Sequence, residues 1–167
     1  MKYLGKLLTL IMVLGSFVLF GQNINSSKST INFKTKGAKG TLSNLAGKVT
    51  FDESDIANAA FDVTVNMSSM NTGNEKRDDH LKTADFFDVF TFPNAKFKSI
   101  GVTKAGDKYE TLGKLDMHGF KKDAKIVFTY DASAKMFTGT MIVDASKHEV
   151  GGNKHSAVEV SIVCYLK

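Results

Sequence analysis

Apolar and polar residues alternate along several stretches of the chain. Residues 61–67 carry Phe, Val, Val and Met at every second position, and residues 126–130, 137–143 and 158–166 repeat this period. Because successive side chains of a β-strand point to opposite faces, a period of two predicts a strand with one buried face. Each of the four stretches therefore predicts a half-buried strand.

Short polar or glycine-containing segments separate these stretches. They lie at residue 37 and at residues 52–58, 105–107, 131–134 and 151–153. Short strands joined by such turns are typical of an all-β antiparallel barrel or sandwich. A βαβ enzyme fold is disfavoured for the same reason.

One helix is predicted among the strands. Thr72 and Glu75 have the spacing of a capping box, in which the threonine hydroxyl and the glutamate carboxylate each take an unpaired backbone N–H. This pattern predicts a helix from about Gly73 to Ala84, followed by an extended stretch that contains Pro93. Apolar residues after the helix are then expected to cover one end of the sheet.

The N-terminus predicts export. Lys2 and Lys6 precede an apolar run at residues 7–20, which is shorter than the roughly 20 residues that a membrane-spanning helix needs. We therefore predict a secretory signal over residues 1–21 and one domain over residues 22–167. The product is expected in the periplasm or secreted, without stable membrane insertion after cleavage. An uncleaved anchor is the alternative, because Leu19 stands where a cleavage site prefers a small residue.

Charge and cysteine content narrow the class of protein further. Loss of Lys2 and Lys6 would take the net charge from +5 to +3, and no basic block with interleaved aromatic residues is present. A nucleic-acid partner is therefore not expected. Cys164 is the single cysteine, so it forms no internal disulfide. Its place on the apolar face of the last strand predicts a buried hydrophobic residue rather than a nucleophile.

Candidate catalytic and metal motifs are weak. The four histidines are scattered without the short spacings that metal sites favour, and neither a G-x-S-x-G elbow nor a phosphate loop occurs. We predict no catalytic residue, no metal, no cofactor and no enzymatic activity; a metal-dependent hydrolase is the weakest alternative. Arg77, Asp78 and His80 are expected to form a hydrogen-bonded brace between the helix and neighbouring strands.

The segment at residues 72–99 carries a family resemblance. Its run Arg77-Asp78-Asp79-His80-Leu81, followed by residues 86–89, 92–93 and 97–99, resembles the pattern RD-x-HL…FFD-x…P-x…F-x-S of the YceI-like proteins. Four further pieces match in the same order, at residues 29–33, 39–52, 113–119 and 158–160. The resemblance implies an antiparallel lipocalin-like barrel of about eight strands, whose helix and aromatic loop cover one end.

The resemblance also implies a function. YceI-like proteins bind lipids and polyisoprenoids, so we expect carriage or storage of an amphiphilic polyisoprenoid or fatty-acid-derived chain in the cell envelope. The residues expected to line an apolar tunnel are Phe61, Val63, Val65, Met67, Phe86, Phe87, Phe97, Leu115, Met117, Phe128, Met141 and Ile162. The polar candidates for its mouth are Arg77, His80 and Lys82.

The sequence leaves some alternatives open. A packed barrel without a ligand would act as a stress-related or surface interaction protein, because inward side chains can fill a barrel of this size. The sequence does not decide the oligomeric state, and a homodimer is one alternative. Two departures from the family pattern, at residues 35–37 and 146–151, fall near strand ends and concern the contacts to a head group rather than the fold.

Overall fold

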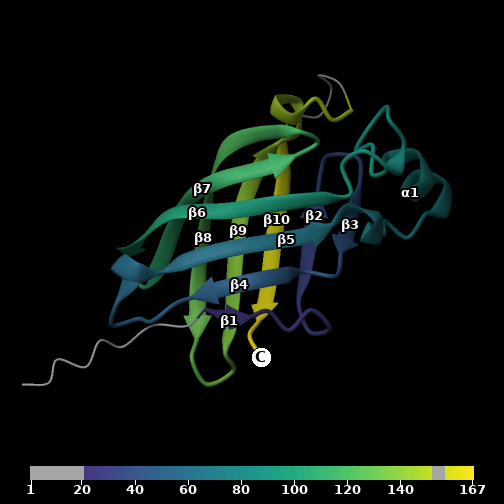
Figure 1. The fold of residues 1–167 in the computed structure, drawn as a ribbon. Coiled ribbons are helices and arrows are strands. Elements are labelled where there is room, and N and C mark those ends of the chain that lie inside the picture. The colour runs from purple at the N-terminus through teal and green to yellow at the C-terminus, as the bar shows by residue number, and fades with distance from the viewer. Residues whose placement is uncertain (1–20, 152–156) are drawn as a thin grey trace, which may run out of the picture.

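A single curled antiparallel sheet forms the body of the protein (Figure 1). The computed structural model describes residues 21–151 and 157–167, so the predicted signal segment lies outside the described residues apart from Gly21. Ten strands are present in the described part, in the spatial order β1-β4-β5-β6-β7-β8-β9-β10-β2-β3. The strands are β1 (Gln22–Asn23), β2 (Thr30–Lys34), β3 (Lys39–Leu42), β4 (Ala46–Thr50), β5 (Ala60–Asn66), β6 (Asn94–Ala105), β7 (Lys108–Met117), β8 (Phe120–Asp131), β9 (Met136–Asp144) and β10 (Ala157–Tyr165).

The sheet curls over so that β4–β7 cross in front of β8–β10 (Figure 1). Two isolated bridges tie its edge strands back to the body. Ile24, just after β1, bridges Leu166, just after β10, and Thr41 of β3 bridges Asn71. The expected antiparallel barrel with one helix is thereby confirmed, but with ten strands in the described part rather than about eight.

The four alternating stretches are confirmed as strands. They lie in β5, β8, β9 and β10, and Cα partners in register connect β8 to β9 and β9 to β10. Met67 is an exception, because the chain leaves β5 at Asn66 and enters a 3₁₀ turn, η2 (Met67–Ser69). Two further 3₁₀ turns, η1 (Ile56–Asn58) and η3 (Ala145–His148), follow strands β4 and β9. Apart from Met67, the period of two in the sequence therefore predicted which side chains of these four strands point into the barrel.

Aromatic side chains pack one end of the barrel. The ring of Phe51 lies at centroid distances of 5.1 to 5.6 Å from four other rings and 6.3 Å from that of Phe61. Most of these pairs meet edge to face, the geometry that the aromatic quadrupole favours. We call this group the aromatic floor; its members are Phe51, Phe61, Tyr109, Phe128, Tyr130 and Phe137.

Helix α1 (Glu75–Lys82) lies at the opposite end of the barrel (Figure 1). Its predicted start at Gly73 and the capping role of Thr72 were wrong. Gly73 has φ +73°, outside the right-handed helical region, and the cap is Asn74, whose side chain accepts a hydrogen bond from the Arg77 N–H at 3.1 Å. The helix is therefore shorter than expected.

Thr72 is instead the centre of a hydrogen-bonded brace, which ties α1 to the segment just before it and not, as predicted, to neighbouring strands. Its hydroxyl donates to the Asp78 carboxylate, while Arg77 donates from Nε to the Thr72 hydroxyl at 2.8 Å and from Nη2 to its carbonyl at 2.9 Å. The hydrogen bond from Thr72 holds the pKa of Asp78 below its usual range. His80 takes no part in these hydrogen bonds, so the brace contains two of the three predicted residues.

Candidate functional site

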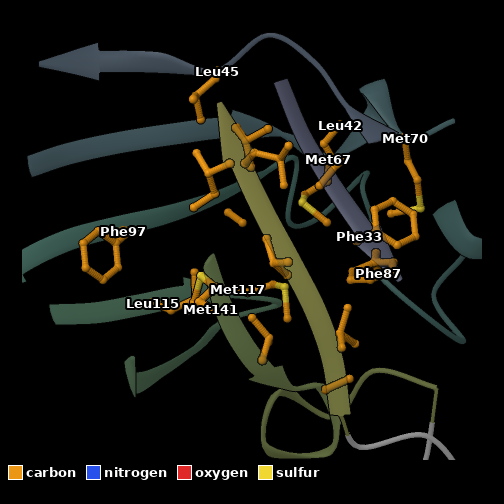
Figure 2. A pocket seen from close by; sticks show the side chains of 18 of the residues that line it. Phe33, Leu42, Leu45, Met67, Met70, Phe87, Phe97, Leu115, Met117 and Met141 are labelled. Atoms are coloured by element: carbon orange, nitrogen blue, oxygen red, sulfur yellow. The ribbon is translucent and has the colours of Figure 1, made fainter. Parts of the chain in front are cut away.

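An apolar cavity of about 500 Å³ occupies the barrel between the aromatic floor and α1. Inward side chains of β2 to β10 and residues of the α1 region form its wall. Figure 2 shows Phe33, Met70 and Phe87 at one side of this space and Phe97 and Leu115 at the other. The volume falls within the range of small-ligand sites, which are concave and mostly apolar.

All twelve apolar residues predicted for a tunnel lie in the wall of this cavity. They come from β5, η2, β6, β7, β8, β9 and β10 and from the loop after α1: Phe61, Val63, Val65, Met67, Phe86, Phe87, Phe97, Leu115, Met117, Phe128, Met141 and Ile162. The structure therefore brings the predicted set together in one place. That these residues contact a ligand stays a prediction.

Several wall residues were missed by the sequence analysis. Ile31 and Phe33 alternate along β2, and Val158 and Val160 precede Ile162 on the same face of β10, so the period of two could have found them. Other wall residues had no such signal, since they lie in turns or between strands; they are Leu45 and Met70. Their position in the cavity wall follows only from the tertiary structure and not from a pattern in the sequence.

The wall contains few groups able to bind a polar ligand atom. The hydroxyl of Thr111, a residue 2% exposed, donates to the Gly101 carbonyl at 3.0 Å and so is already paired. Cys164 is buried as predicted, and burial raises the pKa of its thiol to about 11. The thiol is therefore neutral near pH 7. The deeper wall offers dispersion and hydrophobic contact rather than charge.

Two of the polar wall residues belong to α1, and a third, Lys96, lines the cavity from β6. Arg77 and His80 line the cavity, and the His80 ring meets that of Phe86 edge to face at 4.8 Å. Lys82, the third predicted polar residue, lies in the last turn of α1 and does not line the cavity, so its contact with a head group stays a prediction. The helical period explains the difference, because Lys82 follows His80 by two positions and so points to another side of α1.

The two departures from the family pattern also reach this part of the wall. Thr35 and Gly37 line the cavity from the turn between β2 and β3, and Val150 and Gly151 line it after η3. The Thr35 hydroxyl accepts hydrogen bonds from the N–H groups of residues 37 and 38, which orders that turn. The polar rim of the cavity, which we call the mouth, is therefore made of these segments and α1.

The described histidines do not form a metal site. Within residues 21–151 and 157–167, no three His, Cys, Asp or Glu side chains come close enough together to hold a metal ion. His148, 2% exposed, donates from Nδ1 to the carbonyls of Met117 and Phe120 at 3.2 and 3.1 Å. His118 contacts the His148 carbonyl through Nδ1 at 2.9 Å, and its ring packs on Phe92. These histidines link η3 to the turn between β7 and β8.

No helix in the part of the chain that the structure describes is long and apolar enough to span a membrane.

Several known proteins are similar to this chain in sequence or in fold. Protein YceI of Salmonella arizonae is 39% identical over 83 residues, which are 50% of this chain and 44% of that protein. The match thus spans less than half the length of that curated relative. Among solved structures, BcnA of Burkholderia cenocepacia has a TM-score of 0.79 at 22% identity, covering 84% of this chain and 98% of that one.

A second solved structure is a polyisoprenoid binding domain from Saccharophagus degradans, with a TM-score of 0.61 at 16% identity, covering 87% of this chain and 97% of that one. At these identities both structures support the fold alone. The family model of the YceI-like domain matches residues 22–165, which is nearly the whole described chain. The chain belongs to the YceI-like family.

Proposed function

We propose that this protein binds one amphiphilic lipid-like molecule, with the apolar chain in the cavity and the head group at the mouth. The observation that carries the proposal is an apolar space of about 500 Å³ whose wall has few polar residues, two of which, Arg77 and His80, belong to α1 at one end. An amphiphile with a single polar end matches this distribution. The binding of a polyisoprenoid by the Saccharophagus degradans domain supports the same class of ligand.

The energetics favour such a ligand. Burial of about 400 Å² of hydrocarbon at about 25 cal/mol per Å² is worth on the order of 10 kcal/mol, before the cost of immobilising a flexible chain. Tight binding therefore needs no directional contact deep in the cavity. Arg77 and His80 are the proposed contacts of the head group. No catalytic step is part of this proposal.

The proposal includes carriage or storage of the ligand in the cell envelope. It rests on the apolar run that follows Lys6, which is typical of an exported protein. Intact mass of the exported material should correspond to a chain that begins near Gln22. A full-length mass in the membrane fraction would contradict this part of the proposal.

The binding itself is tested by native mass spectrometry, together with organic extraction of the purified protein. We expect a co-purifying lipid-like molecule. Val65→Trp should remove it, because Val65 lines the cavity and the indole would occupy the space of the chain. The free energy of unfolding of delipidated Val65→Trp should change by less than about 1 kcal/mol, since open space accepts the larger ring.

Val102→Trp is the matched control. Val102 is buried in the core but does not line the cavity, so overpacking there should cost about 1–3 kcal/mol. If the wild type yields no lipid and Val65→Trp is destabilised as much as Val102→Trp, the interior is packed in solution. The alternative of a barrel without a ligand would then replace the proposal.

A further inference from the structure

Gly139 interrupts a row of large side chains in the cavity wall. Direct cross-strand partners on four neighbouring strands are Phe128 of β8, Gly139 of β9, Ile162 of β10 and Ile31 of β2. All four residues line the cavity. Gly139 is the single member of this row that contributes no side chain to the space.

Gly139 stands beside the aromatic floor. Phe137, two positions earlier on β9, belongs to the floor, and the rings of Phe128 and Phe137 lie 5.7 Å apart. In the other direction β9 continues through Met141 toward η3 at the mouth. Gly139 thus lies one step along β9 from the floor, where Phe137 and its β10 partner Cys164 also line the cavity.

The backbone at Gly139 does not require glycine. A Cβ built there would lie 3.1 Å from Ile126 Cγ2, 3.4 Å from Phe128 Cβ and 3.5 Å from the Val127 carbonyl oxygen. Only the first contact is tight, and it is made by the methyl group of a side chain. At Gly113, by contrast, a Cβ would lie 2.4 Å from the Lys98 carbonyl oxygen, so glycine is needed there for the close approach of the backbone.

We propose that Gly139 sets the depth of the cavity and thereby the longest apolar chain that the protein accepts. A larger side chain at this position would extend over the floor and shorten the space without displacing the backbone. The ligands selected are then amphiphiles whose chain reaches the floor at Gly139. This inference rests on the proposed function, because it concerns the same cavity.

The test is a chain-length series measured on the delipidated protein. Linear saturated alcohols from decanol to eicosanol are suitable probes, because they differ only in the length of the apolar chain. In the wild type, affinity should rise by roughly fourfold with each added methylene until the chain reaches the floor, and then stop rising. In Gly139→Leu this break should come at a chain roughly three carbons shorter, since the new side chain displaces a similar volume.

Two further variants keep the test decisive. Gly139→Ala adds one methyl group and should move the break by roughly one carbon even if the leucine variant folds poorly. Thr138→Leu adds bulk at an exposed position of the same strand and should leave the break unchanged. Urea unfolding of each delipidated variant confirms that folded proteins are compared.

The outcomes separate the two proposals. A wild type that binds no alcohol of any length would overturn the proposed function and this inference with it. A wild type with a clear break, shared at the same chain length by both folded Gly139 variants, would overturn this inference alone. An equal shift in Thr138→Leu would also overturn it, because the effect would not come from the cavity.

Discussion

The two ends of the barrel are built from the same residue types and are filled differently. At the floor, Phe51 reaches into the barrel and its ring contacts five other aromatic rings. Toward the mouth, the ring of Phe33 lies against Gly40, so closely that a Cβ there would be 2.6 Å from Phe33 Cζ. One phenylalanine fills the interior, whereas the other lies along its wall.

This difference shows that apolar composition does not decide whether a barrel is packed. A ring fills the centre when other rings meet it from several strands, as around Phe51. A ring that rests on a glycine of the neighbouring strand leaves the centre open. The hollow end therefore depends on where small residues lie opposite large ones.

The largest expected effect separates the two ends directly. Phe51→Ala should lower the free energy of unfolding by about 3–5 kcal/mol, because it removes a ring that is buried on several sides and leaves a cavity. Phe33→Ala should cost less than about 2 kcal/mol, since it enlarges a space that already exists. Urea unfolding of both delipidated variants measures the two values. Equal costs would mean that the two ends are packed alike.

The next effect concerns helix α1, which covers the end of the barrel opposite the aromatic floor. Asn74→Ala should cost about 1 kcal/mol, because the N-terminus of α1 loses its side-chain cap. Asn74→Asp, which keeps the acceptor oxygen, is the control and should retain most of the stability. If the alanine variant unfolds at the same urea concentration as the wild type, the cap at Asn74 contributes nothing to the fold.

A smaller effect is expected at the packed end. The Tyr109 hydroxyl donates to Glu53 Oε1 at 2.9 Å, and this hydrogen bond raises the pKa of the phenol. Tyr109→Phe keeps the ring in the floor and loses only the hydrogen bond, so it should cost about 0.5–1 kcal/mol. Glu53→Gln keeps an acceptor and serves as the control. A loss as large as that of Phe51→Ala would show that the hydroxyl, not ring packing, holds this end together.

The smallest effect is a pH dependence at η3. Burial lowers the pKa of His148 from its ordinary value of 6.5. The unfolded chain then takes up a proton before the folded chain does, so stability is present above pH 6.5 and is lost as the pH falls below it. Lys122 adds to the lowering, while Asp116 and the hydrogen bonds to two carbonyls oppose it.

His148→Asn keeps an N–H donor and removes the titration. The difference in stability between wild type and variant should therefore shrink or reverse as the pH falls from neutral to acidic. Parallel stability curves over this range would show that His148 does not titrate differently in the folded chain.

Much of the fold and of the cavity wall could be predicted from the chain. The period of two in β5, β8, β9 and β10 identifies both the strands and their inward residues, because side chains alternate between the faces of a strand whatever the sheet around them. All twelve apolar residues predicted in this way or from the resemblance line the cavity. Local rules at the helix were less reliable: Thr72 fits a capping box, yet Asp78 and Arg77 hold it in another role.

The sequence by itself determined four of the strands, their inward faces and the single helix, since each depends on residues near one another in the chain, and its spaced motifs determined the family. The tertiary structure decided whether the interior is open. It placed Phe51 among five rings, rested Phe33 on Gly40, and left Gly139 bare beside the floor. These contacts are made between residues of different strands. They therefore depend on the curl and register of the whole sheet and not on any local pattern in the sequence.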